Sequence, residues 1–325
     1  MVIVGDIGGT HARLALVAPS GRFVRSAVFE SHKYPSLEAV LRAFLDTAKK
    51  PKPSVAVLGV AGPVVDGRCV ATNLPWVVDA RSLSRKVGIR RVSLLNDLVA
   101  LSLGALGVPR ARLRVLTGGG IPKKRAGNIA VIAAGTGLGE ALLLWDRTHF
   151  IPSATEGGHA AFAPQDDVEV ELLQFLRARF GHVSWERVLS GGGLGNIYDF
   201  FRQAKGVTES TANVEALAAA PDRNALISEL GIAGKSDAAA HAVDLFATMY
   251  GAETGNLALK MLAVGGVYVC GNIAVQMLGV LERGGFARAF KAKGRLTPLM
   301  EKIPVAVVLG DAIGLAGAAR VALGH

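Results

Sequence analysis

The sequence is poor in cysteine, and this excludes several kinds of protein. Only two cysteines occur in 325 residues, Cys69 and Cys270, and they lie far apart. Two isolated thiols provide neither the disulfide framework of a small secreted domain nor the closely spaced ligands of a structural zinc site. We therefore expect a fold that depends on its hydrophobic core.

Aromatic residues are also scarce, at 6% of the chain, although the formal net charge is +10. A basic surface can bind nucleic acid. The basic stretches at 81–91, 123–125 and 287–295 lack the interleaved aromatic residues of a platform that stacks single-stranded bases. We interpret these stretches as solvated faces and expect no nucleic-acid partner.

One uncharged stretch, residues 261–281, is long enough to span a bilayer. It contains four glycines, Asn272 and Gln276, and the segment "GGVYVCGN" within it is typical of a buried strand that enters a turn before a helix. Asp6 interrupts the first apolar run, so no secretory leader is expected. We expect a cytoplasmic protein without a membrane partner.

Several common catalytic and nucleotide-binding motifs are missing. The nearest match to a Walker loop, "ELGIAGKS" at 229–236, begins with Glu229 where the motif needs glycine. The segment "GTGLGE" at 135–140 approaches a dinucleotide fingerprint, but an apolar return strand follows it instead of a helix. Neither an HExxH metal motif nor a GxSxG nucleophile motif occurs.

The length and hydrophobic pattern predict two α/β domains, because 325 residues exceed one ordinary core. Apolar runs predict strands, and helical spacing of apolar residues predicts helices. The predicted strands cover residues 2–4, 12–18, 23–29, 55–60, 91–96, 266–270 and 304–309, and a hairpin covers 128–145. The predicted helices cover residues 36–50, 97–105, 166–180, 194–204, 212–219, 222–230, 236–263, 272–283 and 311–323.

Two segments share one plan of apolar strand, small-residue turn and apolar return strand. They are "MVIVGDIGGTHARLALV" at the start of the chain and "NIAVIAAGTGLGEALLLW" at 128–145. Each turn has the composition of a structural hairpin, but also that of a loop whose backbone N–H groups bind phosphate. The repetition suggests a duplicated domain in which two such turns clamp a triphosphate.

Acidic residues follow several predicted strands, where ligands bind in open α/β sheets. They are Asp6, Asp97 and Glu156. Asn96 and Asp97 could cap a helix, but two such residues exceed what one cap needs, which favours a functional role. His159 lies beside Glu156 and two glycines, which favours a polar binding loop over a core histidine. Glu186 fits an ordinary solvated helix turn, and pattern alone would not select it.

Taken together, these segments resemble the bacterial glucokinase family, within the hexokinase/actin-like superfamily. The matching segments run in family order from residue 5 to about residue 323: "GDIGGTHARLAL", "GVAGPV", "TNLPW", "LLNDLVALSLGA", "AAGTGLGEALL", "EGGHAAFAP", "HVSWERVLSGGGLGNIY", "GGVYVCGNIA" and "GDAIGLAGAARVAL". The resemblance implies an α/β, two-domain actin-like/ribonuclease H-like fold, in which helices flank mixed β-sheets around an interdomain cleft. It implies a small domain of residues 1–107 plus 298–325 and a large domain of residues 108–297.

The resemblance also implies an activity, which is phosphorylation of glucose at its 6-hydroxyl with ATP and Mg. Asp97 matches the residue that removes the hydroxyl proton, and Asp6 matches an acid near the metal, which it would meet through water. The implied glucose contacts are Asn96, Asp97, Glu156, His159 and Glu186. The implied ATP contacts are Gly5, Asp6, Ile7, Gly8, Gly9, Thr10, Gly135, Thr136, Gly137, Gly271 and Asn272. The resemblance further implies a homodimer.

The chain departs from the family pattern on the nucleotide side. His11 stands where asparagine is usual, and Asn272 stands where a second glycine is usual. Two cysteines cannot form the zinc motif of the related repressor and kinase group, so the chain is placed outside that group. Two alternatives stay open: a kinase that uses another hexose or a polyphosphate donor, and a non-catalytic sugar sensor.

Overall fold

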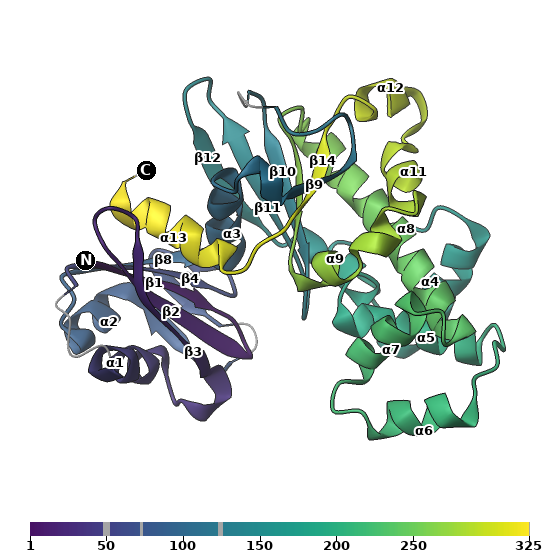
Figure 1. The fold of residues 1–325 in the computed structure, drawn as a ribbon, viewed down its shortest axis with the longest axis horizontal. Coiled ribbons are helices and arrows are strands. Elements are labelled where there is room, and N and C mark those ends of the chain that lie inside the picture. The colour runs from purple at the N-terminus through teal and green to yellow at the C-terminus, as the bar shows by residue number, and fades with distance from the viewer. Residues whose placement is uncertain (48–52, 72–73, 123–125, 325) are drawn as a thin grey trace. The chain divides into compact units, whose positions relative to one another are not determined.

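In the computed structural model, residues 1–47, 53–71, 74–122 and 126–324 are described. The predicted end of the first helix at 48–50, the basic stretch 123–125, and Thr72 and Asn73 of the "TNLPW" segment lie outside these residues. The chain forms two compact units (Figure 1). Unit 1 comprises Met1–Arg112, Pro152–Ala154 and Gly310–His325, and unit 2 comprises Leu113–Ile151 and Thr155–Leu309. The domain boundaries after residues 107 and 297 stay a prediction.

Unit 1 is built on a five-stranded sheet with the order β3-β2-β1-β4-β8. The antiparallel strands β1 to β3 form its first half, and β4 and β8 continue it parallel to β1. The bounds are β1 Val2–Ile7, β2 His11–Val17, β3 Phe23–Glu30, β4 Val55–Val60 and β8 Arg91–Asn96. Three short strands form a second sheet: β5 Val64–Val65, β6 Arg68–Val70 and β7 Val77–Asp79.

Helices cover both faces of the main sheet of unit 1 because its strands are apolar on both sides. Ile3 and Ile7 of β1 pack in one core with α1 and α2, whereas Val2 and Val4 pack in another core with α13. Figure 1 shows α13 on one face, and α1 and α2 on the other. The helices are α1 Leu37–Thr47, α2 Ala80–Val87, α3 Asp97–Leu106 and α13 Ile313–Leu323, with the short 3₁₀ turns η1 Ser31–Lys33 and η2 Arg110–Arg112. By this alternation Asp6 lies on the α13 side of the sheet.

Helices α3 and α13 pack closely because small residues line their contact. A Cβ atom at Gly317 would lie 1.7 Å from the carbonyl oxygen of Ala100, and one at Gly104 would lie 2.0 Å from that of Ile313. No side chain fits at either position. This packing holds the start of α13 next to the carboxyl end of β1, where Gly314 meets Asp6.

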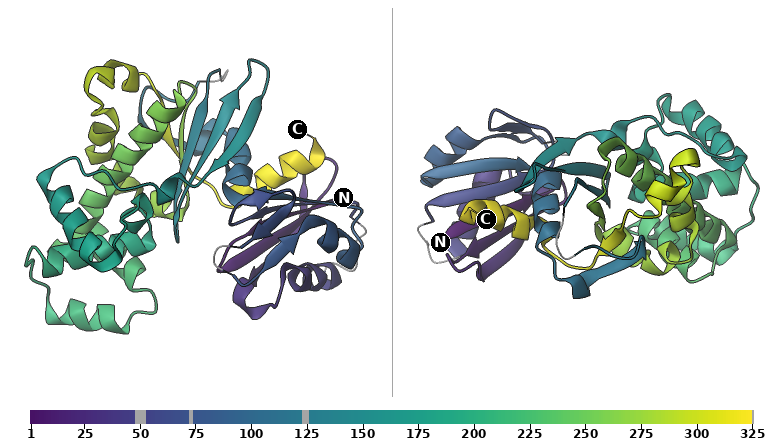
Figure 2. Two further views of the ribbon diagram at one scale, coloured as in Figure 1. Left: turned by 180° about the vertical axis from the view of Figure 1, so that it is seen from behind. Right: turned by 90° about the horizontal axis from the view of Figure 1, so that it is seen from above.

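Unit 2 is built on a six-stranded sheet with the order β12-β11-β10-β13-β14-β9. Its strands are β9 Leu113–Thr117, β10 Ile129–Ala134, β11 Leu138–Trp145, β12 Phe150–Thr155, β13 Gly266–Cys270 and β14 Val305–Val308. The long helix α8, Asp237–Met261, lies against one face of this sheet, as Figures 1 and 2 show. Ala130, Ile132 and Ala134 of β10 share a buried core with Tyr250 of α8.

Eight further helices complete the helical part of unit 2 that the structure describes. They are α4 Asp167–Phe180, α5 Gly191–Gln203, α6 Thr211–Ala219, α7 Arg223–Ile232, α9 Asn272–Gln276, α10 Leu278–Leu281, α11 Gly285–Lys291 and α12 Thr297–Met300. Three 3₁₀ turns complete the unit: η3 Gly157–His159, η4 Trp185–Arg187 and η5 Gly294–Leu296. Among the helices that the structure describes, none has both the length and the apolar character needed to cross a membrane.

The two main sheets share an order, which agrees with the duplication that the sequence suggests. In each sheet an opening strand pairs antiparallel with the next strand and parallel with a later one: β1 with β2 and β4, and β10 with β11 and β13. A second parallel strand follows on the same side, β8 in unit 1 and β14 in unit 2. This repeated α/β architecture confirms the predicted fold class.

Some predicted boundaries are wrong. The first strand extends to Ile7, so Gly5, Asp6 and Ile7 belong to β1 and only Gly8 to Thr10 form the turn. The predicted helix 272–283 is divided into α9 and α10 at Met277. The short strands β5 to β7 and the strands β9 and β12 were not predicted, because they lack a long apolar run.

Candidate active site

The first glycine turn joins β1 to β2. The amide of Gly8 donates to the carbonyl of His11 at 3.0 Å, which closes the turn. The hydroxyl of Ser31 donates to the carbonyl of Gly8 at 2.8 Å, and the amide of Ser31 donates to the carbonyl of Thr10 at 2.9 Å. The turn is therefore held from one side by the start of η1, and Thr10 is left exposed.

The second glycine turn joins β10 to β11 and has a similar construction. The amide of Gly135 donates to the carbonyl of Gly137 at 2.8 Å, and the amide of Gly191 donates to the carbonyl of Gly135 at 2.9 Å. Thr136 is exposed, as Thr10 is in the first turn. Both turns are thus fixed from behind while their tips stay accessible.

Backbone conformation does not explain the glycines in these turns. Among the described residues with positive φ, none lies within Gly8–Thr10 or Gly135–Gly137. A Cβ atom at Gly135 would meet no protein atom within 4 Å. Glycine at this position therefore keeps a surface bare, which suits close approach of a ligand to the backbone.

The turns also present unused hydrogen-bond donors. Within the described part of the chain, the amide groups of Gly9, Thr10, Thr136 and Gly137 donate to no protein acceptor. Successive free N–H groups beside glycine form the kind of concave surface that binds phosphate oxygens. Each turn therefore offers two such donors.

Asp6 lies at the end of β1 beside Gly314 of α13. A Cβ atom at Gly314 would lie 3.2 Å from Cγ of Asp6, so the absence of a side chain lets the helix start approach the carboxyl group. Burial raises the pKa of Asp6, and the Arg13 guanidinium, 3.9 Å from Oδ2, opposes part of this rise. A cation near Asp6 would oppose the rise further.

The carboxyl group of Asp6 fits a magnesium ion that keeps most of its water. No group of three or more His, Cys, Asp or Glu residues that could hold a metal is found in the described part of the chain. Mg²⁺ in phosphate-transfer sites needs only one or two carboxylates, with water and phosphate oxygens as its other ligands. A single carboxylate that is mostly buried but still accessible at 30% of its side chain suits that mode.

Asn96 and Asp97 stand where β8 passes into α3. Oδ1 of Asn96 accepts from the amides of Leu98 and Val99 at 3.0 and 3.2 Å, and its Nδ2 donates to the carbonyl of Gly62 at 3.1 Å. Asn96 is therefore the N-cap of α3, and its Oδ1 serves this structural role. The second N–H of its Nδ2 donates to no acceptor among the described residues and is available to a ligand.

Asp97 is the first residue of α3 and is half-buried. Its Oδ1 accepts from the amide of Leu98 at 2.9 Å, which fixes the orientation of the carboxylate. Burial raises the pKa of the Cys69 thiol, and the charge of Asp97 raises it further, so β6 lies close to this carboxylate. The helix N-terminus and the bond to the Leu98 amide therefore fix the position of the Asp97 carboxylate.

Glu156 precedes η3 and His159 is its last residue, in the loop that follows β12. Both side chains are exposed. The carbonyl of Glu156 accepts from the amide of His159 at 3.0 Å, and His182 Nε2 lies 3.2 Å from the carbonyl of His159. The carbonyl of Ala160 accepts from the amide of Trp185 at 3.0 Å, which ties the loop to η4. The loop bearing Glu156 and His159 is therefore held next to the turn that bears Glu186.

Glu186 contacts the second glycine turn directly. Its Oε2 accepts from the amide of Leu138 at 3.0 Å, and a Cβ atom at Gly137 would lie 2.3 Å from the same oxygen. Glycine at position 137 therefore makes room for the Glu186 carboxylate. Unit 2 thus brings Glu186 together with Gly135–Gly137, a contact that the sequence pattern did not indicate.

Gly271 and Asn272 follow β13, and Gly271 packs against Ala134, the residue before the second glycine turn. Gly271 has a φ of 92°, and a Cβ atom there would lie 2.6 Å from the carbonyl oxygen of Ala134, so glycine is required. Asn272 begins α9 with no positive φ. Asparagine in place of the usual glycine therefore adds no backbone strain. His11, the other departure, begins β2 opposite Glu30.

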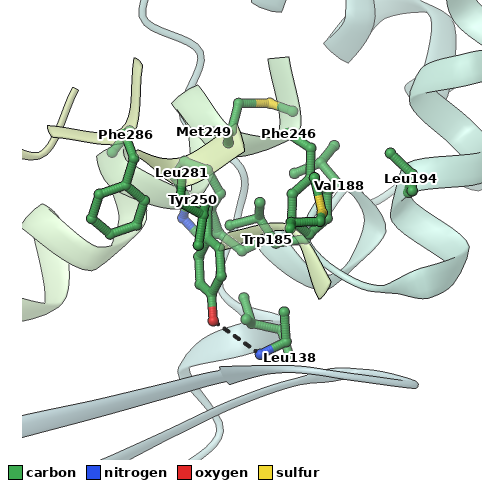
Figure 3. Close-up of a cluster of buried hydrophobic side chains, with 14 of the residues drawn as sticks. Leu138, Trp185, Val188, Leu194, Phe246, Met249, Tyr250, Leu281 and Phe286 are labelled. Atoms are coloured by element: carbon green, nitrogen blue, oxygen red, sulfur yellow. Dashed lines mark hydrogen bonds between the residues drawn. The ribbon is translucent and has the colours of Figure 1, made fainter. Parts of the chain in front are cut away.

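Tyr250 supports the second turn, and sequence reasoning missed it. This tyrosine is fully buried in α8, and its hydroxyl oxygen accepts from the amide of Ala134 at 3.2 Å. Figure 3 shows the Tyr250 hydroxyl pointing out of the hydrophobic cluster, with a dashed line that marks this hydrogen bond. Burial raises the pKa of Tyr250, so the hydroxyl stays neutral. A helical apolar pattern around Tyr250 gave no sign of this contact.

Comparison with known proteins identifies the family. The model of the family described as "Glucokinase" matches residues 3–325. The chain belongs to the glucokinase family. A glucokinase from Nostoc sp. is 36% identical over 336 residues, which cover 98% of each chain.

Solved structures of glucokinases share the fold. A glucokinase from an Antarctic psychrotroph has a TM-score of 0.82 and 31% identity, and the match covers 100% of this chain and 99% of that one. A glucokinase from Balamuthia mandrillaris, solved in complex with glucose, has a TM-score of 0.84. Its identity is 23%, with 99% and 93% of the chains covered, so this second likeness supports the fold alone.

Proposed function

We propose that this member of the glucokinase family transfers the γ-phosphoryl group of ATP to the 6-hydroxyl of glucose, giving glucose 6-phosphate and ADP. The observation that carries the proposal is the pair of glycine turns with free amides at Gly9, Thr10, Thr136 and Gly137. Two turns of this kind suit a triphosphate, because its charge is spread over several oxygens. Family membership across the whole chain supports the reaction class.

Asp97 is proposed as the general base. Its carboxylate is oriented by the Leu98 amide and lies at the start of α3. It would accept the proton of the sugar hydroxyl as that oxygen attacks the phosphorus atom. Phosphoryl transfer depends mainly on such positioning and on charge stabilisation, so a fixed carboxylate is what the reaction requires.

The nucleotide phosphates are proposed to lie on the glycine turns. The proposed contacts are Gly5, Asp6, Ile7, Gly8, Gly9 and Thr10 in unit 1, and Gly135, Thr136, Gly137, Gly271 and Asn272 in unit 2. Amide N–H groups would donate to phosphate oxygens without side chains in the way. Gly5 and Ile7 would act through the strand that carries Asp6, since both are buried.

Asp6 is proposed to hold Mg²⁺ through water. The ion would neutralise phosphate charge and orient the phosphate chain. Asp6 itself would orient the ion's water molecules, and Arg13 opposes part of the rise in the pKa of Asp6 that burial causes.

The sugar is proposed to contact Asn96, Asp97, Glu156, His159 and Glu186. These side chains supply both hydrogen-bond donors and acceptors, as a polyol requires. A site of this kind rejects sugars that lack a hydroxyl, because its own polar groups would then lose a partner. The same carboxylate of Glu186 contacts the second glycine turn, so sugar and nucleotide binding would be linked through it.

A release assay over a panel of hexoses and phosphoryl donors tests the proposal. We expect the highest kcat/KM with glucose and ATP in the presence of Mg²⁺, and product phosphorylated at the 6-position. A preference for polyphosphate, which the +10 charge motivates, would overturn ATP as donor. A preference for another hexose would overturn glucose, and absence of transfer with every pair would favour a sugar sensor. We further propose a homodimer located in the cytoplasm.

A further inference from the structure

Two glutamates are buried together in unit 2. Glu140 of β11 is 1% exposed and Glu253 of α8 is fully buried. Their carboxyl groups lie close enough for each to influence the pKa of the other. Buried carboxyl groups need partners, because ionisation away from water is costly. The partners of the two residues differ.

Glu253 is well supplied with donors. The amide Nδ2 of Asn256 donates to its Oε2 at 2.8 Å, and Nζ of Lys260 lies 3.4 Å from its Oε1. By contrast, Oε1 of Glu140 is buried and receives no hydrogen bond from any N–H or O–H group in the described part of the chain. The carboxyl group of Glu253 is close enough to influence it.

A proton on the pair removes this deficit. Burial raises the pKa of Glu140 to about 8, and the charge of Glu253 contributes to the rise. Burial also raises the pKa of Glu253, while Asn256 and Lys260 lower it. The pKa of each carboxyl group is thus raised, and because the two groups are coupled, the pair titrates as a unit that keeps one proton more readily than either group would alone. Two ionised carboxylates in contact would repel each other strongly.

Glu140 touches the loop that carries Glu156 and His159. A Cβ atom at Gly157 would lie 2.0 Å from Oε2 of Glu140, so the carboxyl group rests against the backbone of the loop. The hydroxyl of Thr155 donates to the carbonyl of Glu140 at 3.2 Å and accepts from the amide of Gly157 at 3.1 Å. Movement of Glu140 would therefore be transmitted to the loop.

Among the described residues, few other titratable groups influence the pair. Lys260 and Tyr250 face it from α8, and Lys293 faces Glu253 from the segment after α11. Nζ of Lys293 donates to the carbonyl of Ala252 and to Oδ1 of Asn256. The charge of Glu169 in α4 also acts on Lys293 and raises its pKa. Burial lowers the pKa of Lys293, and burial raises the pKa of Tyr250 so that its hydroxyl stays neutral. The cation that pairs with Glu253 is Lys260, whose Nζ lies 3.4 Å from Oε1.

We propose that Glu140 and Glu253 share one proton and thereby position the Glu156–His159 loop for the sugar, so that loss of this proton at alkaline pH weakens glucose binding. The inference rests on the proposed function, because it assumes that this loop binds glucose. Asn256 and Lys260 anchor Glu253, so repulsion would displace Glu140 toward Gly157. Glu140 is a positioning residue, since it contacts the loop and not the sugar.

The test is glucose binding by calorimetry from pH 7 to 9.5, on the full-length wild-type protein and three variants. If only the protonated pair is competent, the apparent Kd of the wild type rises about tenfold from pH 7 to pH 9. Glu140→Gln and Glu253→Gln each provide a permanent N–H donor within the pair, so their Kd should stay constant. In the matched control Glu169→Gln, another 1% exposed glutamate is changed without contact to the loop, and the wild-type rise should persist.

Two results would overturn the inference while leaving the proposed function intact. One is a wild-type Kd that does not change with pH, and the other is a tenfold rise that persists in both Gln variants of the pair. Glu253→Gln decides the matter if Glu140→Gln fails to fold by circular dichroism. Absence of glucose binding at every pH would instead overturn the proposed function, and the inference with it. Steady-state kinetics add a second readout: KM for glucose should follow the Kd, and KM for ATP should not.

Discussion

The carboxylate of Glu186 accepts a hydrogen bond of 3.0 Å from the amide of Leu138, and this contact joins a proposed sugar ligand to the second glycine turn. A hydrogen bond to a charged group contributes about 1.5–3 kcal/mol. Glu186→Gln weakens this bond and removes the charge. We expect KM to rise about tenfold or more for both glucose and ATP.

The control for this change is Glu215→Gln, at an exposed glutamate of α6. It should leave both constants unchanged. A Glu186→Gln enzyme in which only the glucose KM rises would show that the contact with the turn carries no energy for the nucleotide.

Gly135 offers a direct test of the phosphate role of the second turn. It has no positive φ, and a Cβ atom would meet nothing in the protein within 4 Å. Gly135→Ala should therefore fold with unchanged stability, yet raise KM for ATP, because the methyl group occupies the surface that the phosphates approach.

Gly279 of α10 provides a matched control for Gly135, since it also lacks a positive φ and has open space around it. Gly279→Ala should leave both Tm and KM unchanged. If Gly135→Ala binds ATP as the wild type does, phosphates do not lie against that turn.

Asn96 combines two roles that substitution can separate. Asn96→Ala removes the cap of α3, which should cost about 1 kcal/mol of stability. Asn96→Asp keeps the Oδ1 acceptor for Leu98 and Val99 but loses the Nδ2 donor. We expect Asn96→Asp to recover only part of the lost Tm, because it also loses the bond from Nδ2 to the Gly62 carbonyl, while its glucose KM stays raised.

Ser210→Ala is the control for a lost cap, because Ser210 caps α6 through the amide of Asn213 at 3.2 Å. It should lower Tm slightly without changing the glucose KM. Full recovery of glucose binding in Asn96→Asp would mean that Asn96 acts as a cap and nothing more.

Glu140 should make stability depend on pH. Its pKa is raised from 4.5 to about 8, so the folded protein keeps a proton that the unfolded chain releases above pH 4.5. The stabilisation from this proton is complete below pH 4.5, declines as the pH rises, and is lost above about pH 8. Urea midpoints of the wild type should fall relative to Glu140→Gln between pH 5 and 8 and run parallel above pH 8. Curves that are parallel throughout would contradict the raised pKa.

The sequence predicted the features that local chemistry determines. Apolar runs around Gly8 and Gly135 predicted two strand–turn–strand units, and the two sheets repeat one strand order around them. The pattern at Asn96 and Asp97 predicted a strand passing into a helix, and the structure has this transition.

Contacts between distant segments could not be predicted in this way. Glu186 meets Leu138, and Tyr250 meets Ala134, only after the chain has folded, and neither side chain belongs to a local motif. The pairing of Glu140 with Glu253 could not be predicted either, because in the sequence each is a single glutamate within a mostly apolar strand or helix. Such tertiary contacts support the glycine turns and the polar loop, whose own residues were recognisable.

The central claim is that Asp97 removes the proton of the attacking hydroxyl, and Asp97→Asn tests it most directly. Asparagine keeps an Oδ1 acceptor for the amide of Leu98, and Asn96 still caps the helix, so the fold and glucose binding should persist. The control Asp79→Asn changes an aspartate that caps α2 through Ser82 and should leave kcat unchanged. We predict that kcat of Asp97→Asn falls by about 10²- to 10⁴-fold with near-normal glucose affinity. Turnover within a few-fold of the wild type would contradict the account.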